Sequence, residues 1–251
     1  MLSTQYLIDI ILRRELVEDF SAYPFALDAV RELDRLRLHR AVTFFVGENG
    51  SGKSTLLEAI AVAWGFNPEG GSRNFNFATH ASHSPLHRAL RLSRGLRKPR
   101  DGYFLRAESF YNVASEIDRL DQEGGGPPLR DSYGGLSLHA QSHGESFFSL
   151  LMHRLRGQGL YLFDEPEAAL SPNRQLAMLS RLHQLVNQDS QFVIATHSPI
   201  LLAYPDALIY RFDASGISAV AYEDTEHYKI TRDFLNHPRR SLDLLLAPDE
   251  P

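Results

Sequence analysis

The sequence predicts an α/β fold with a doubly wound, mostly parallel sheet, because short apolar runs alternate with helical patterns along the chain. Runs of β-prone apolar residues cover 42–46, 160–163 and 192–195. A cluster of polar residues follows each of these three runs directly. Since ligands of such sheets bind beyond the carboxyl ends of the strands, we expect the three clusters to meet at one edge.

The first half of the chain is expected to hold two strands and two helices. Residues 6–12 are mostly apolar, as in a strand, whereas 25–38 carry apolar side chains every third position with charges between them, a helix-like period. Residues of helical composition fill 53–63, after the strand at 42–46. The segment 66–101 is rich in Gly, Asn, Ser, His and Arg, which predicts loops with one short basic helix.

The second half continues the alternation of strands and helices. A Gly-Gly-Gly-Pro-Pro run breaks the pattern midway, and apolar residues at helical or strand spacing define the other segments. Besides the two strands already given, the expected elements are a strand at 102–107, a helix at 110–120, helices at 146–156 and 173–187, and a closing hairpin of 208–212 with 217–222.

Length and composition limit the classes of protein to be considered. The chain has 251 residues, 43% hydrophobic and 23% charged, which is typical of a globular protein, and we expect one domain over 1–251. The net charge of −5 gives no overall attraction to nucleic acid or membrane. Cysteine is absent, which excludes disulfides and thiolate metal sites. With neither a signal peptide pattern nor an apolar run of membrane-spanning length, we expect a cytoplasmic protein without membrane insertion.

Residues 47–55, Gly-Glu-Asn-Gly-Ser-Gly-Lys-Ser-Thr, carry the most informative motif of the chain. They fit G-x-x-x-x-G-K-[ST] between a predicted strand and a predicted helix, so backbone N–H groups can converge on phosphate oxygens. Lys53 would reach the β- and γ-phosphates, and Ser54 would ligate Mg²⁺. The motif predicts a nucleoside-triphosphate site. The residues expected to bind the nucleotide here are Glu48, Asn49, Gly50, Ser51, Gly52, Lys53, Ser54 and Thr55.

Acidic and imidazole side chains follow the two other buried runs. Asp164 could hold Mg²⁺ and Glu165 could orient or deprotonate an attacking water, although acids at a strand end can also simply face solvent. His197 follows the next strand, where it could sense a γ-phosphate or serve a structural role. Beside a phosphate loop, the functional interpretation of the acidic pair is favoured.

A Ser/Gly-rich segment, residues 142–146, precedes a predicted helix. The start of such a helix can bind an anion, but the same residues also serve as an ordinary helix cap.

Together these segments resemble ABC-type ATPases of the P-loop NTPase class, in order and in spacing. The resemblance identifies the phosphate loop as Walker A, 160–165 as Walker B, 168–171 as the D-loop and 141–145 as a variant of the L-S-G-G-Q signature. The Glu at the end of that variant resembles the chromosome-maintenance and DNA-repair branch of the family, and the forms of residues 47–55 and 196–199 resemble the bacterial RecF-like group. Short segments including Glu226-His227-Tyr228 resemble a small stand-alone bacterial group of predicted ATPases. A helical signature subdomain over about 75–155 and a small antiparallel portion are therefore expected.

The resemblance also implies a mechanism. Two copies would sandwich two ATP molecules, with Ser142, Gly144 and Glu145 of one chain facing the phosphate loop of the other. Mg²⁺ would be held by Ser54 and Asp164. The family's Q-loop glutamine is missing, and Glu108 stands nearest to its place. The residues that the resemblance assigns to catalysis are Glu165, Lys53 and His197.

Three functions are compatible with the phosphate loop of such a chain. The first is a switch that acts on DNA or on a protein partner in genome upkeep or defence. A basic segment supports it: Arg88, Arg91, Arg94, Arg97, Lys98 and Arg100, which could bind phosphates or form a solvated helix face. The alternative is the ATP-binding subunit of a membrane ABC transporter, and the third is a small-molecule kinase.

Two minor patterns have weaker interpretations. His80, His83 and His87 lie close together but without cysteine or a nearby acid, so they make a weak case for a metal. Tyr23 and Phe25 could stack on adenine, but packing in the core is the favoured interpretation of each.

Overall fold

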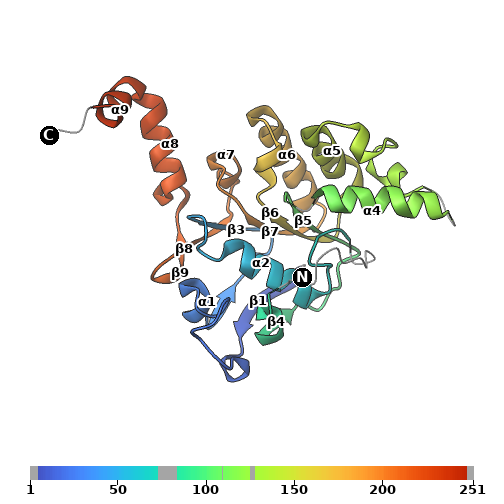
Figure 1. Cartoon of the computed structure of the whole chain (residues 1–251), viewed down its shortest axis with the longest axis horizontal. Coiled ribbons are helices and arrows are strands. Elements are labelled where there is room, and N and C mark those ends of the chain that lie inside the picture. The colour runs from blue at the N-terminus through green and yellow to red at the C-terminus, as the bar shows by residue number, and fades with distance from the viewer. Residues whose placement is uncertain (1–4, 73–83, 109, 125–127, 248–251) are drawn as a thin grey trace.

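The apolar runs of the sequence form the centre of a six-stranded sheet in the computed structural model, which describes residues 5–72, 84–108, 110–124 and 128–247 (Figure 1). The strand order is β5-β6-β7-β3-β8-β9, and only the edge pair β8–β9 is antiparallel. This confirms the predicted mostly parallel α/β fold. The strands are β3 (Val42–Gly47), β5 (Asp101–Arg106), β6 (Gly159–Asp164), β7 (Gln191–Ala195), β8 (Leu208–Asp213) and β9 (Gly216–Val220).

The register brings the carboxyl ends of three central strands together. Ala195 of β7 pairs with Phe45 of β3 on one side and with Asp164 of β6 on the other. The loops that follow β3, β6 and β7 therefore leave the sheet side by side, as the sequence predicted.

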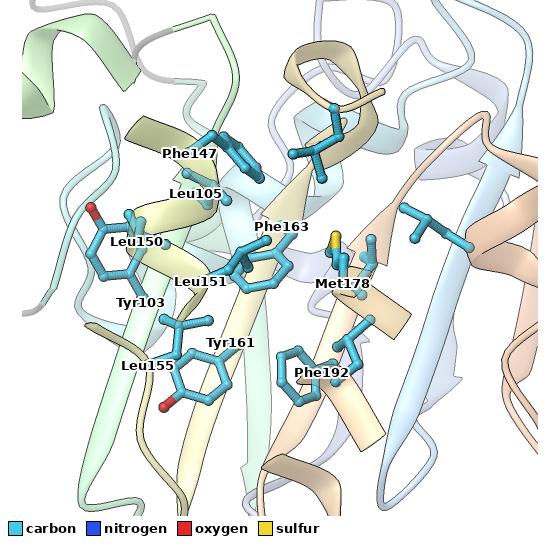
Figure 2. Close-up of a cluster of buried hydrophobic side chains, with 14 of the residues drawn as sticks. Tyr103, Leu105, Phe147, Leu150, Leu151, Leu155, Tyr161, Phe163, Met178 and Phe192 are labelled. Atoms are coloured by element: carbon cyan, nitrogen blue, oxygen red, sulfur yellow. The ribbon is translucent and has the colours of Figure 1, made fainter. Parts of the chain in front are cut away.

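Successive side chains of the strands pack into two separate hydrophobic cores, because side chains alternate between the faces of a sheet. Phe44 joins a cluster with helices on one face, part of which Figure 2 shows, and Phe45 joins the cluster on the other face. The first face is covered by α4 (Phe110–Glu123), α5 (His143–Ser149), α6 (Pro172–Val186) and α7 (Pro199–Leu202). The second is covered by α2 (Lys53–Trp64) and a small sheet.

The small antiparallel sheet has the order β2-β1-β4, with β1 at Leu7–Leu12, β2 at Arg35–Arg37 and β4 at Leu90–Arg94. Gln191 ties it to the main sheet: its side-chain oxygen accepts from the backbone N–H of Tyr6 and Leu7, and its amide donates to two backbone carbonyls. The predicted strand at 6–12 and the predicted closing hairpin are confirmed.

The helix predicted over 25–38 is wrong for most of its length. Only α1 (Asp28–Arg31) is helical, and β2 follows it. In β2 the burial alternates, with Leu36 buried between exposed Arg35 and Arg37, and Leu36 pairs with Ile10 of β1. Strand pairing with a distant segment overrides the local period of three.

The basic segment is divided between the end of a short helix, a strand and a loop. Helix α3 covers only Leu86–Ala89, and β4 continues directly from it and pairs with β1. Within the predicted subdomain 75–155, α4 and α5 cover the six-stranded sheet. Strand β4 belongs to the small sheet and β5 belongs to the six-stranded sheet. The limits of the subdomain stay a prediction.

Two further helices, which the sequence did not lead us to expect, follow the hairpin. Helix α8 (Glu226–Asn236) and helix α9 (Pro238–Leu245) project from the β8–β9 edge of the sheet (Figure 1). In the described ranges, every helix is too short or too polar to cross a bilayer.

Candidate functional site

The loop after β3 has the backbone that its glycines allow. Gly52 ends the loop at φ 97°, a left-handed conformation that costs glycine nothing. A Cβ on Gly47 would lie 2.3 Å from the backbone oxygen of Phe212 on the neighbouring strand β8, so this position also requires glycine. The loop therefore leaves β3 in close contact with β8 and turns directly into α2.

Lys53, the first residue of α2, brings a buried positive charge to the loop. Its side chain is only 4% exposed, and its ammonium donates to the carbonyl oxygens of Gly47 and Glu48, both at 2.8 Å. Burial lowers the pKa of Lys53, while Glu165 and Asp164 nearby oppose that shift. Two backbone carbonyls are weak partners for a buried cation, so the environment favours an added anion.

Ser54 and Asp164 meet at the same edge. The Ser54 hydroxyl donates to Oδ1 of Asp164 at 2.8 Å, although the two residues are 110 positions apart. Burial raises the pKa of Asp164 to about 6, against the opposing effects of Ser54 and Arg106. A hydroxyl oxygen beside a carboxylate is a donor set of the kind that Mg²⁺ takes.

The raised pKa of Asp164 predicts a pH-dependent cost to stability. The folded protein binds the Asp164 proton more tightly than the unfolded chain, so the cost is absent below about pH 4, grows as the pH rises, and is complete above about pH 6. We expect Asp164→Asn to raise the melting temperature by roughly 5 °C at about pH 7.5 with EDTA, and by about half as much near pH 5. Thermal unfolding measures both values.

Asp243→Asn on α9, where the side chain is exposed, is the matched control and should leave the melting temperature unchanged. An equal gain for Asp164→Asn at both pH values, or a loss, would contradict the assignment of the cost to the Asp164 proton.

Glu165 follows β6 in a strained backbone conformation. Its φ of 50° and ψ of 52° are left-handed, which costs a residue other than glycine about 1–2 kcal/mol. Such strain is found at functional sites. The side chain borders a cavity of about 200 Å³ together with Lys53, Ser54 and Thr55. A second cavity of about 490 Å³ is lined by residues 47–51 of the loop and by the end of β8.

His197 completes the group of predicted residues. Its backbone N–H donates to Oε1 of Glu167 at 2.5 Å, and its ring Nε2 lies 3.8 Å from Oε1 of Glu165. Burial, Lys53 and His227 lower the pKa of His197, with Glu165 opposing, so the ring is neutral at physiological pH. The structure thus brings Lys53, Ser54, Asp164, Glu165 and His197 to one place.

Glu108, which the sequence suggested for Mg²⁺, takes a different partner. Its carboxylate is paired with Arg106, and the Glu108 side chain is 69% exposed. Arg106 also pairs with Glu58 at 2.5 Å and lies 3.9 Å from Asp164. The carboxylate of Glu108 is therefore paired with the guanidinium of Arg106. The structure does not place Glu108 with Ser54 and Asp164 as a third ligand for Mg²⁺.

The segment 142–145 lies apart from the phosphate loop of its own chain, because α5 and α2 cover opposite faces of the sheet (Figure 1). Ser142 caps α5: its backbone N–H and hydroxyl donate to Oε2 of Glu145 at 3.0 and 2.6 Å. A Cβ on Gly144 would lie 2.7 Å from the carbonyl oxygen of Ala169, which requires glycine there. The segment is thus a capped helix start packed on the loop after Walker B.

Two residues near the site were missed or misjudged from the sequence. Tyr23 is 66% exposed, borders the smaller cavity and lies 3.2 Å from Thr55 through its hydroxyl, so core packing was the wrong interpretation for it. Phe25 does pack against the core. His227 of α8 contacts His197. In the sequence, His227 was noted only as part of a segment that resembles other predicted ATPases, and no role was assigned to it. No local pattern connects residues 30 positions apart.

The basic segment and the group of three histidines were the other patterns singled out in the sequence. The six basic side chains of 88–100 are all exposed, and Arg94 lies over the ring of Trp64 at 4.4 Å. His80 and His83 lie outside the described residues. In the rest of the chain that the structure describes, no cluster of three His, Cys, Asp or Glu residues is placed to hold a metal.

Another cavity lies at the amino ends of β5 and β6. It measures about 900 Å³, and two of the charged residues that line it are paired with each other. Arg154 contacts both carboxylate oxygens of Asp101 at 2.9 and 3.1 Å, and Tyr161 donates to the same carboxylate. The carboxyl edge of the sheet therefore remains the candidate site.

Two family models match parts of this chain. A family model described as "AAA domain" matches residues 18–112. A second, described as "AAA domain, putative AbiEii toxin, Type IV TA system", matches residues 78–203, which is half of the chain. No curated protein matches the chain in sequence.

Three solved structures are similar to this chain at low sequence identity. A putative metal-chelate type ABC transporter in an inward-facing conformation is 14% identical over 90% of this chain and 88% of the other, with a TM-score of 0.50. The SMC head domain from Thermotoga maritima is 16% identical over 86% and 98%, with a TM-score of 0.44. The cbiO1 protein from Clostridium perfringens, part of the ABC transporter complex cbiONQ, is 17% identical over 96% and 99%, with a TM-score of 0.48.

Proposed function

The chain belongs to the family described as "AAA domain, putative AbiEii toxin, Type IV TA system", and from this membership we propose that it binds ATP with Mg²⁺ and hydrolyses it as an ABC-type ATPase. The observation that carries the proposal is the meeting of five side chains from three separate strand ends. They are Lys53, Ser54, Asp164, Glu165 and His197.

Unsatisfied polar atoms at this edge fit a phosphate ligand. Within the described part of the chain, Ser51 Oγ and His197 Nε2 are buried without a hydrogen-bond partner. Such atoms cost stability unless a ligand or water satisfies them. Together with the Lys53 ammonium they provide three donors for an anion of the size of a triphosphate.

Each residue then has a distinct role. Lys53 would exchange its two backbone carbonyl partners for phosphate oxygens, a stronger charge-assisted bond. Ser54 and Asp164 would hold Mg²⁺, which when bound neutralises charge on the β- and γ-phosphates. Glu165 would accept the proton of the attacking water, and His197 would donate from Nε2 to the γ-phosphate. Tyr23 is exposed beside the loop, where an adenine ring could stack on it.

We further propose that two copies enclose the nucleotides. The capped start of α5, with Ser142, Gly144 and Glu145, lies away from the phosphate loop of its own chain, so a second copy would have to supply it. The contact joins different surfaces at each site and closes by a two-fold axis. Hydrolysis would remove the bridging γ-phosphate and release the pair, which makes the protein a switch.

We propose duplex DNA as the partner of this switch, because the basic segment is an exposed run of like charge. Phosphate contacts of this kind are independent of sequence and weaken with salt. We expect duplex DNA to stimulate ATP hydrolysis severalfold, and we expect the triple variant Arg91→Gln, Lys98→Gln, Arg100→Gln to lose that stimulation while keeping its basal rate. Steady-state ATP hydrolysis with and without DNA is the measurement, with Glu165→Gln as the blank.

The matched control removes three exposed positive charges from the C-terminal helices, as Arg232→Gln, Arg239→Gln, Arg240→Gln. It should respond to DNA as the wild type does. Turnover by the wild type that ignores DNA would exclude DNA as the partner, and capture experiments with the ATP-bound Glu165→Gln protein would then search for a protein partner.

A further inference from the structure

His227 meets His197 at the candidate site from the far end of the chain. Nδ1 of His197 and Nε2 of His227 are 3.0 Å apart, and the ring centroids are separated by 5.1 Å. His197 follows β7, whereas His227 lies in the first turn of α8, after the chain has passed through the β8–β9 hairpin. The contact therefore links the site to a helix that carries none of the motifs.

The first turn of α8 is held firmly enough to position a side chain. Thr225, buried to 1% exposure, caps the helix by accepting from the backbone N–H of Tyr228. The Tyr228 ring packs on Tyr222 at 4.6 Å, and the Tyr222 hydroxyl donates to the backbone oxygen of Pro199 at 3.0 Å. Pro199 is two residues beyond His197, so the start of α8 is fastened to the same loop that carries His197.

The two rings are neutral, so one must donate and the other accept. Burial and Lys53 lower the pKa of His227 as they do that of His197, and Glu226 opposes the shift at His227. The charged groups that face the pair are Lys53 from α2, Glu165 from the end of β6 and Glu226 from α8. A neutral imidazole has one N–H and one lone pair, and the partner of one nitrogen fixes the role of the other.

Glu165 favours one tautomer of His197, and a donor at His227 adds to that preference. Nε2 of His197 lies 3.8 Å from the Glu165 carboxylate, so a hydrogen on that nitrogen is attracted and a lone pair is repelled. Nδ1 of His197 then bears the lone pair and must accept from His227 Nε2–H. The same arrangement directs the Nε2–H of His197 into the site.

We propose that His227 is a positioning residue: it donates to His197 and thereby holds His197 with its Nε2–H directed at Glu165 and at the γ-phosphate of bound ATP. The part that concerns the phosphate rests on the proposed function. The part that concerns the tautomer rests only on the contacts of the protein itself.

The tautomer can be measured without nucleotide. Histidine ¹⁵N chemical shifts, recorded at about pH 8 so that the rings are neutral, distinguish Nε2–H from Nδ1–H, and loss of a signal in His197→Gln assigns the His197 ring. We expect the Nε2–H form in the wild type and in His227→Gln, whose amide nitrogen can donate from the same position. We expect a mixture of both forms in His227→Phe. His237→Phe, at an exposed position beyond α8, is the control and should match the wild type.

A wild-type His197 ring protonated at Nδ1, or an unchanged tautomer in His227→Phe, would overturn the proposal. A folded His227→Gln with the spectrum of His227→Phe would also overturn it, because donation by residue 227 would then not be the cause.

Kinetics add a second readout once ATP binding is established. If one neutral hydrogen bond is lost in the transition state, the rate of the chemical step falls about tenfold. We therefore expect His227→Phe to lower kcat for ATP about tenfold with KM changed less than about twofold, and His227→Gln to recover most of the rate. An equal rise in KM would assign His227 to ATP binding instead. If no variant binds ATP, the proposed function fails while the tautomer measurement still decides the inference.

Discussion

Glu165→Gln is expected to bind Mg-ATP and to hydrolyse it about 10²–10⁴-fold more slowly than the wild-type protein. The amide occupies the same volume beside the cavity of Lys53 and Ser54 but cannot accept the proton of the attacking water. It also removes one of the three carboxylates that act on Lys53, so affinity for ATP should be kept or increased. Single-turnover hydrolysis and nucleotide-binding titrations measure the two effects separately.

The same variant should accumulate as a dimer. If the γ-phosphate bridges two copies and cannot be removed, light scattering on the gel-filtration peak should show twice the monomer mass with Mg-ATP and the monomer mass with ADP. A Glu165→Gln protein that stays monomeric with saturating Mg-ATP would exclude the two-copy arrangement.

Glu108→Gln is the matched control for the loss of a carboxylate near the site. Because Glu108 is exposed and paired with Arg106, we expect its substitution to change hydrolysis by less than about threefold, the scale of a surface ion pair. A loss as large as that of Glu165→Gln would instead place Glu108 at the metal, as the sequence suggested.

The parts of the site that the sequence predicted are those fixed by local chemistry. The phosphate loop needs glycine at defined positions between a strand and a helix, and Gly47 and Gly52 show why. Asp164 ends the buried strand β6 and His197 lies two residues beyond the buried strand β7, and parallel strands bring their carboxyl ends together. For these residues, short segments and one rule of sheet topology were sufficient.

The parts that the sequence did not predict depend on contacts between distant segments. Residues 25–38 have a helix-like period, yet Leu36 pairs with Ile10 in a strand, because burial in the small sheet outweighs local propensity. His227 reaches His197 only because the β8–β9 hairpin reverses the chain before α8 begins. Neither pairing has a local pattern, so neither could be inferred from one sequence.

Lys53→Ala is expected to lower the affinity for Mg-ATP by about 100-fold or more. The substitution removes the buried ammonium that would bind the phosphates, and two charge-assisted hydrogen bonds are worth about 1.5–3 kcal/mol each. It also leaves Asp164, Glu165 and Glu167 without the cation that attracts them, so the remaining field repels a triphosphate. Calorimetric titration of ATP with Mg²⁺ measures the loss.

Lys53→Met separates the loss of charge from the loss of volume. The methionine fills the space beside the loop, so this variant should fold with a melting temperature within a few degrees of the wild type, yet bind ATP as weakly as Lys53→Ala. Among the described residues, the buried ammonium donates hydrogen bonds to the carbonyl oxygens of Gly47 and Glu48, which are weak partners for a charge, so we expect its loss to affect ATP binding more than stability. Wild-type affinity for ATP in a folded Lys53→Met protein would remove the phosphate-loop assignment, and with it the proposed roles of Ser54, Asp164 and Glu165.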